Sequence, residues 1–241
     1  IKIAVKSLGL DDLAPFNPKE RIIEYLIGGT GAFSLLEKNL REFSDVTASE
    51  SPAPGGGSIA AYSGALGAAL STMVANLSAN KRGWDDRWEE FSDWADKGQT
   101  YHTHLLALVD ADTAAFNGIM DAYGLPKSSE DQILARSVAI QAATKHAIDI
   151  PMQVAEIAHN AFEVAEAMAQ FGNPNSITDA GVGAMCLRTA VLGAILNARV
   201  NTADLNDAAF VSSTLARCSE LLSSTKSREA AILARVDELL G

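Results

Sequence analysis

The stretch Ala53–Asn80 constrains the fold more than any other part of the chain. It reads APGGGSIAAYSGALGAALSTMVANLSAN, in which a glycine-rich turn is followed by about six helical turns without a charged residue. Apolar residues such as Leu66 and Leu77 recur at helical spacing, which predicts a helix. Gly64 and Gly67 let a neighbouring backbone approach closely, so we expect this helix at the centre of a bundle.

The turn before the predicted helix consists of Pro54, Gly55, Gly56 and Gly57. These residues permit a tight loop with exposed backbone, and Ser58 is the expected cap of the helix that follows. Such a junction points N–H groups and the positive end of the helix dipole at a bound group, which favours an anion or a polar ring edge. A flexible linker is the alternative interpretation of the three glycines.

Composition and charge exclude several classes of partner. The uncharged run is long enough for a membrane span, but it consists mainly of small and polar residues and lacks a positively charged flank, which favours a buried helix and no membrane partner. The formal net charge of −11 argues against nucleic acid as a partner. Two cysteines without a CxxC pattern, Cys186 and Cys218, indicate thiols in a reducing cytoplasm.

Helical patterns continue through the rest of the chain, and no alternating strand pattern of useful length appears. Helices are expected over about 34–43, 86–123, 129–171, 179–199 and 204–240. The first would start with a capping box of Ser34 and Glu37, and Pro151 predicts a kink in the third. The predicted fold class is therefore all-α, a bundle of long antiparallel helices.

Two aspartates interrupt an apolar helical run, LLALVDADTAAF. Asp110 and Asp112 lie two residues apart and cannot share a helix face, so one is expected to face solvent while the other projects inward. A carboxylate held in an apolar bundle should have a raised pKa, as a general acid or base at neutral pH requires. Asp179, Asn197 and Asn201 belong to a second Ala- and Gly-rich helix and are expected to converge on the same cavity.

No metal site is expected, because none of the four histidines has a partner at the spacing of metal ligands. Lys81 and Arg82 follow the C-terminal end of the predicted central helix. Cations at that position suit the helix dipole, which is an alternative to any role in ligand binding.

Taken in order, these motifs resemble the cyclodeaminase domain of the formiminotransferase-cyclodeaminase family. The resemblance covers nearly all of residues 35–220 and rests on APGGGSIAAYSGALGAALSTMVANLS, the following KR, LVDADTAAF, LPK, the GN before TDAGVGA, and GAILNARVN. Methenyltetrahydrofolate cyclohydrolases share the PGGGS and DAD features. Residues 8–27 resemble the linker between the two domains of the bifunctional family. We therefore expect a linker over residues 1–30, after a missing formiminotransferase domain, and a helical cyclodeaminase domain over residues 31–241.

The resemblance implies a cytoplasmic, dimer-forming or larger homo-oligomeric enzyme of histidine degradation and one-carbon folate metabolism. Its substrate would be a tetrahydrofolate derivative, 5-formiminotetrahydrofolate, which it converts to 5,10-methenyltetrahydrofolate with release of ammonia, and no cofactor would be tightly bound. Asp112, the second aspartate of DAD, would be catalytic. The expected substrate-binding residues are Pro54, Gly55, Gly56, Gly57, Ser58, Lys81, Arg82, Asp110, Asp179, Asn197 and Asn201, with the basic pair meeting a folate glutamate tail, which can be polyglutamylated.

The chemistry suits a carboxylate. The formimino group is an amidine that is cationic when protonated, and the methenyl product is also a cation, so a carboxylate stabilises both. Asp112 can take the proton of N10 and deliver it to the leaving nitrogen, with Asp110 or Asp179 tuning its pKa. Two alternatives stay open: a methenyltetrahydrofolate cyclohydrolase, and a non-catalytic helical module that mediates oligomerisation.

Overall fold

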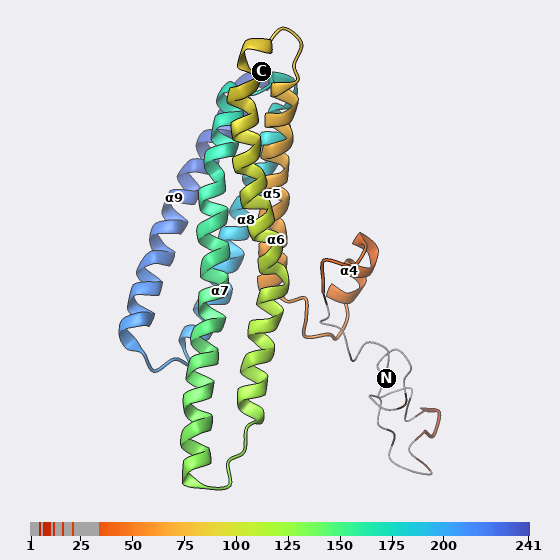
Figure 1. The fold of residues 1–241 in the computed structure, drawn as a ribbon, viewed down its shortest axis with the longest axis vertical. Coiled ribbons are helices and arrows are strands. Elements are labelled where there is room, and N and C mark those ends of the chain that lie inside the picture. Colours follow the sequence, from red (N-terminus) through yellow and green to blue (C-terminus); the bar gives the residue numbers. More distant parts are fainter. Residues whose placement is uncertain (1–4, 6, 11, 13–15, 17–20, 22–33) are drawn as a thin grey trace. The chain divides into compact units, whose positions relative to one another are not determined.

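The computed structural model describes residues 5, 7–10, 12, 16, 21 and 34–241 of the chain (Figure 1). The chain divides into two compact units, Ile1–Glu37 and Lys38–Gly241. The linker expected over residues 1–30 lies mostly outside the described residues. The second unit carries the candidate site.

Long helices make up most of the second unit: α5 (Gly56–Ala79), α6 (Trp88–Gly124), α7 (Glu130–Phe171), α8 (Ile177–Thr202) and α9 (Ala208–Leu240). The shorter elements are α4 (Leu40–Thr47), η1 (Asp85–Arg87) and η2 (Pro174–Ser176). No strand occurs in the part of the chain that the structure describes, so the all-α prediction is confirmed. The four long helices predicted after the central one also agree with α6 to α9 to within a few residues, and α7 continues through Pro151.

The first predicted helix is displaced. It was expected over 34–43 with Ser34 and Glu37 as its capping box, whereas α4 begins at Leu40. Its cap is Asn39, whose Oδ1 accepts a hydrogen bond from the backbone N–H of Glu42 at 3.0 Å. Ser-x-x-Glu and Asn-x-x-Glu both match the capping pattern, and this stretch of sequence contains one of each.

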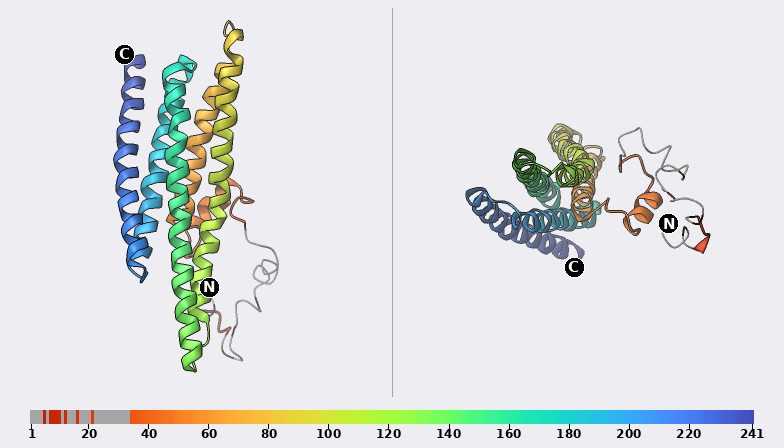
Figure 2. Two further views of the ribbon diagram at one scale, coloured as in Figure 1. Left: turned by 60° about the vertical axis from the view of Figure 1, so that its left-hand side comes forward. Right: turned by 90° about the horizontal axis from the view of Figure 1, so that it is seen from below.

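The helices α5 to α8 form a bundle in which each packs against its neighbours (Figures 1 and 2). α5 lies between α6 and α8, α7 packs on α6 and α8 from the other side, and α9 lies against α7 and α8 at the edge. The second half of α6 and the first half of α7 extend beyond the start of α5 (Figure 1). The N-terminal end of α5, the C-terminal end of α8 and the middle of α6 consequently meet at one level of the bundle.

Small side chains bring α5 and α8 together. A Cβ added at Gly67 would lie only 2.7 Å from the carbonyl oxygen of Gly183, so the two backbones are in direct contact there. Three larger apolar side chains of α5 face outward instead: Leu66, Met73 and Leu77 are 44%, 38% and 45% exposed. The helix is central as predicted, but it packs through its glycine, alanine and serine face.

Two segments, Gly56–Ala79 and Pro174–Thr202, are long and apolar enough to cross a membrane by length and composition. Within the bundle, 61% and 50% of their most apolar windows are buried. Core helices of a bundle meet the same criteria, and both segments pack against each other and against α7.

Candidate active site

A cavity of about 250 Å³ lies where α5 begins. The turn before α5 forms one wall, α6 and α7 form two others, and the last turns of α8 close it. Its lining includes Gly55, Gly56, Gly57, Asp112, Thr113, Phe116, Asn197, Val200 and Asn201. The structure therefore brings the predicted glycine turn, one aspartate of the DAD motif and both predicted asparagines to a single place.

Asp112 is the carboxylate of this cavity. Its Oδ2 accepts a hydrogen bond of 2.9 Å from the hydroxyl of Ser58. Burial raises the pKa of Asp112 above its ordinary value, while the hydrogen bonds from the side chain and backbone N–H of Ser58 act in the opposite direction. The prediction of an inward-facing aspartate with a raised pKa is confirmed.

Gly57 makes room for this carboxylate. A Cβ at position 57 would overlap the side chain of Asp112, with both carboxylate oxygens and Cγ in the way. Its φ is not positive, unlike those of Gly9 and Gly83, so the backbone conformation does not require glycine there. The close approach of Asp112 is what excludes a side chain at this position.

The N-terminal turn of α5 was expected to be capped by Ser58 and to attract an anion. Gly55 occupies the cap position without a side-chain bond, and Ser58 lies inside the first turn, where its hydroxyl binds Asp112 instead. The backbone N–H of Ser58 also favours the ionised form of Asp112 and so opposes the rise of its pKa. The negative charge at this helix N-terminus is therefore supplied by the protein itself.

Asn197 and Asn201 contribute two side-chain amides to the cavity wall. Nδ2 of Asn197 donates to the carbonyl oxygen of Gly193 at 2.8 Å, and Nδ2 of Asn201 donates to that of Ala147 at 3.0 Å. Because a carbonyl only accepts, these bonds identify Nδ2 of each amide as the donor and leave each Oδ1 as an acceptor. Together with Asp112, they make a set of acceptors suited to a cation or to N–H groups.

Besides Ser58, which lies behind the cavity wall, Pro54, Asp110 and Asp179 are predicted site residues that do not line the cavity. Pro54 is buried in the turn, and Asp110 lies two residues before Asp112 on a different side of α6. Asp179 belongs to the first turn of α8, about 27 Å along the helix from Asn197 by the rise per residue. Asp179 therefore does not converge with the asparagines, and its charge suits the N-terminal end of the helix dipole.

Lys81 and Arg82 also lie apart from the cavity. They follow the last residue of α5, about 36 Å along the helix from Gly57. Nζ of Lys81 lies 3.8 Å from the centre of the Trp84 ring, a cation–π contact within the same turn. Within one chain, the basic pair is not part of the wall around Asp112.

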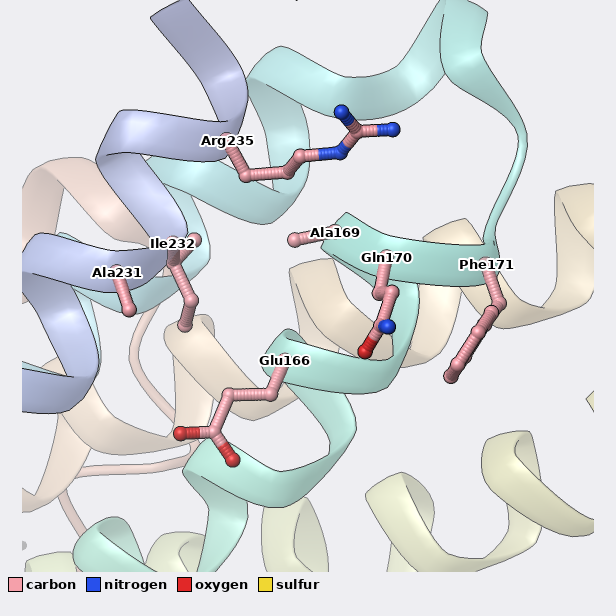
Figure 3. A pocket seen from close by; sticks show the side chains of 7 residues that line it. All are labelled: Glu166, Ala169, Gln170, Phe171, Ala231, Ile232 and Arg235. Carbon is pink, nitrogen blue, oxygen red and sulfur yellow. The ribbon is translucent and has the colours of Figure 1, made fainter. Parts of the chain in front are cut away.

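A larger hollow of about 580 Å³ lies between the last turns of α7 and α9 (Figure 3). Its two charged side chains are already paired, Glu166 with Arg228 and Arg235 with Glu238. Among the described residues, no group of three or more His, Cys, Asp or Glu side chains is placed to hold a metal ion. The smaller cavity around Asp112 is thus the better candidate for chemistry.

Comparison with known proteins assigns this arrangement to a family. The family model described as formiminotransferase-cyclodeaminase matches residues 39–220. The chain belongs to the formiminotransferase-cyclodeaminase family. A second model, that of the formiminotransferase domain, matches residues 1–28. The resemblance seen in the sequence motifs is confirmed.

Relatives within and beside this family are similar over most of the chain. A formimidoyltransferase-cyclodeaminase of Rattus norvegicus is 37% identical over 238 residues, which are 98% of this chain and 44% of the relative. A methenyltetrahydrofolate cyclohydrolase of Methylorubrum extorquens is 36% identical over 185 residues, 77% of this chain and 89% of the relative. The chain thus spans less than half the length of its bifunctional relatives.

A solved structure shares the fold. The crystal structure of a formiminotetrahydrofolate cyclodeaminase from Thermotoga maritima superposes with a TM-score of 0.70 at 29% sequence identity, covering 86% of this chain and 97% of the other. The helical bundle described above is therefore the fold of a cyclodeaminase-type domain.

Several lining residues of this formiminotransferase-cyclodeaminase family domain were not predicted from the sequence, among them Thr113, Phe116 and Val200. Phe116 lies four residues after Asp112, one turn further along the same helix face, so helical spacing from the catalytic candidate could have found it. Thr113 directly follows Asp112 in the sequence. Its role depends on a contact with Ser58, 55 residues earlier in the chain, and no local pattern reveals that contact.

Proposed function

We propose that this domain is a formimidoyltetrahydrofolate cyclodeaminase, which closes the ring of 5-formiminotetrahydrofolate to 5,10-methenyltetrahydrofolate and releases ammonia. The observation that carries the proposal is the half-buried Asp112, whose pKa is raised by burial, in a cavity walled by hydrogen-bond acceptors. Support also comes from the names of the relatives and of the solved Thermotoga maritima structure.

The reaction needs one proton to move between two nitrogens. N10 attacks the carbon of the protonated formimino group, and a C–N bond forms. Asp112 takes the proton from N10 and gives it to the former formimino nitrogen, whose bond to carbon then breaks as ammonia leaves with the electron pair. The carboxylate ends ionised, as it began, and its charge stabilises both the amidinium and the methenyl cation.

The cavity accommodates the reacting end of such a substrate. Its volume of about 250 Å³ is below the usual range, about 300–1,000 Å³, of sites that enclose a whole ligand of drug size. The ring system can pack against Phe116 and Val200, while the Oδ1 atoms of Asn197 and Asn201 accept from its N–H groups. The remainder of the folate, with its glutamate tail, extends out of the cavity.

The proposed partners are an attached formiminotransferase domain and further copies of the chain. An attached formiminotransferase domain is supported by the match of residues 1–28 and by the bifunctional relatives. Self-association is supported by the exposed apolar side chains of α5 and α8. Lys81 and Arg82 can meet the substrate only if its glutamate tail is long or if a second copy of the chain supplies them. The free thiols of Cys186 and Cys218 support a cytoplasmic setting.

A second candidate function is that of a methenyltetrahydrofolate cyclohydrolase. It is favoured by the Methylorubrum extorquens relative, of which 89% of the length aligns with this chain. In that reaction Asp112 would take a proton from a water molecule that attacks the methenyl carbon. The same cavity can serve both reactions. Which of the two substrates the protein turns over therefore decides between the two functions.

The deciding experiment supplies 5-formiminotetrahydrofolate and follows methenyltetrahydrofolate absorbance and ammonia together. Both products are expected to rise at equal rates, and Asp112→Asn to lower kcat by about 100-fold or more, the usual contribution of a general acid–base group. Asp121→Asn, an exposed aspartate on the same helix, is the matched control and should retain activity.

The other outcomes are equally informative. Faster loss of added methenyltetrahydrofolate, without ammonia from the formimino substrate, would establish the cyclohydrolase instead. Full activity of Asp112→Asn would remove Asp112 from the chemistry. No turnover of either compound by the folded protein would leave the non-catalytic helical module as the correct interpretation.

A further inference from the structure

The carboxylate of Asp112 is tied to two hydroxyl groups that the reaction described above does not use. Ser58 is 0% exposed, and its Oγ donates to Oδ2 of Asp112 at 2.9 Å. Oγ1 of Thr113 lies 3.3 Å from Oγ of Ser58. Thr113 is part of the cavity wall, whereas Ser58 lies behind it.

The direction of these hydrogen bonds follows from counting protons. A serine hydroxyl has one hydrogen, and that of Ser58 is given to the carboxylate. In its contact with Thr113, Ser58 can then only accept, so Thr113 is the donor. The three groups form a chain from Thr113 through Ser58 to Asp112, and each bond polarises the next.

The two oxygens of Asp112 are not equivalent in this arrangement. Oδ2 is held by the buried hydroxyl of Ser58, where no bulk water can replace it. Oδ1 is the atom closest to the place that a Cβ of Gly57 would occupy, and Gly57 lines the cavity. Rotation of the carboxylate away from this orientation would break the bond between Oδ2 and Ser58.

We propose that Ser58 and Thr113 are positioning residues for the cyclodeaminase reaction: they hold Oδ2 of Asp112 in place, so that Oδ1 is the oxygen that exchanges the proton with the substrate nitrogens. This inference rests on the proposed function of the domain. It assigns Ser58 a role behind the carboxylate, in place of the contact with substrate that its sequence position suggests, and it adds Thr113 to the site.

Holding one oxygen has two consequences for catalysis. A fixed carboxylate keeps Oδ1 within reach of both nitrogens on the reacting carbon, and misplacement by about 1 Å can lower a rate about 100-fold. The hydroxyl of Ser58 also favours the ionised form, which is the form that takes the proton from N10. Loss of that hydroxyl should therefore affect kcat and its pH dependence more than substrate binding.

The test compares the pH–rate profiles of Ser58→Ala, Thr113→Val and Thr113→Ser with that of the unmodified protein. Ser58→Ala is expected to lower kcat by about tenfold or more with KM changed less than about threefold, and to move the acid limb of kcat to higher pH. Thr113→Val should also lower kcat and move the acid limb to higher pH, but by smaller amounts. Thr113→Ser, which keeps the hydroxyl, should restore them.

A second readout does not depend on turnover. Titration of the Asp112 carboxyl group by carbon NMR should give a higher pKa in Ser58→Ala than in the unmodified protein, because a donor to the ionised form has been removed. Circular dichroism and thermal unfolding check that each variant is folded, and the Thr113 pair decides the matter if Ser58→Ala does not fold.

Unchanged kcat and an unchanged acid limb in a folded Ser58→Ala or Thr113→Val protein would overturn the positioning role while leaving the proposed function in place. A loss of activity in Thr113→Ser as large as in Thr113→Val would also overturn it, since packing and not the hydroxyl would then be responsible. The absence of turnover by the unmodified protein would instead remove the proposed function, and the NMR titration would still test the chain of hydrogen bonds.

Discussion

Position 57 tolerates no side chain, because the carboxylate of Asp112 fills the space where a Cβ would stand. In Gly57→Ala the methyl group must push Asp112 aside, and the reacting oxygen moves with it. We expect kcat to fall by about 100-fold or more, since a misplacement near 1 Å costs that much. Steady-state kinetics with the formimino substrate measures the change.

Gly118→Ala is the matched control for this prediction. Gly118 lies on α6, six residues after Asp112, and a Cβ there would meet nothing within 4 Å. Its replacement should leave kcat within about twofold and stabilise the helix by about 0.5–1 kcal/mol. A Gly57→Ala protein with the kcat of the unmodified protein would show that the carboxylate does not occupy the position described.

Asp112 should also make stability depend on pH. Burial raises its pKa in the folded state above the unfolded value, so the folded state binds the proton more tightly. The stability that this provides is fully present below the unfolded pKa and is lost as pH rises through the folded pKa. Asp112→Asn cannot ionise and should therefore gain stability relative to the unmodified protein as the pH rises from acid toward neutral.

Urea unfolding at a series of pH values measures this difference. Asp121→Asn, which removes an exposed charge from the same helix, controls for the change in net charge. A difference between Asp112→Asn and the unmodified protein that stays constant across the series would contradict the prediction, because it would mean that ionisation of Asp112 carries no cost in the folded state.

At the scale of elements, the contact between α5 and α8 depends on the absence of side chains. A Cβ at Gly67 would lie 2.7 Å from the carbonyl oxygen of Gly183 and 2.8 Å from Cγ of Leu187. Gly67→Ala should therefore force the helices apart and lower the free energy of unfolding by about 1–3 kcal/mol, the usual cost of overpacking. Denaturant unfolding measures this free energy, with Gly118→Ala as the control. An unchanged unfolding midpoint in Gly67→Ala would show that the helices can separate without cost.

The helices themselves could be predicted from the sequence because their signals are local. Periodic apolar residues, the GLPK break and the glycine turn mark α5 to α9 to within a few residues. The packing face of α5 was less evident, because Leu66 and Met73 appear to be its core residues until the glycine face is seen against α8. The close approach of two backbones depends on both helices together, so the sequence of α5 alone does not reveal it.

The site was predictable only in part, for the same reason. The helical pattern left open which aspartate of DAD faces inward, since this depends on how α6 is rotated in the bundle, and only the family resemblance pointed to Asp112. It grouped Asp179 with Asn197 because both belong to one helix, although that helix is 26 residues long and they lie near its opposite ends. It assigned Ser58 to a cap, because the bond to Asp112, 54 residues away, has no local signature.

At the scale of the whole molecule, net charge limits where two copies can meet. With a formal charge of −11 the copies repel one another, so an interface is favoured where charge is absent. No residue of α5 is charged, and its exposed Leu66 and Met73 are accompanied by the exposed Val182, Met185 and Leu196 of α8. Exposed apolar side chains on two packed helices are typical of an association surface.

A double substitution, Leu66→Glu with Met73→Glu, should therefore separate the copies. Two carboxylates buried without partners cost a few kcal/mol, and the dissociation constant should rise by at least about 100-fold, since 1.4 kcal/mol corresponds to tenfold. Sedimentation velocity over a range of concentrations measures the change. The control is Leu134→Glu, at a residue of α7 that is 66% exposed and lies near the tip of the α6–α7 hairpin. If Leu134→Glu dissociates the protein and the α5 variant does not, the copies associate through the hairpin. If the unmodified protein is monomeric at micromolar concentration, neither surface is an interface between copies.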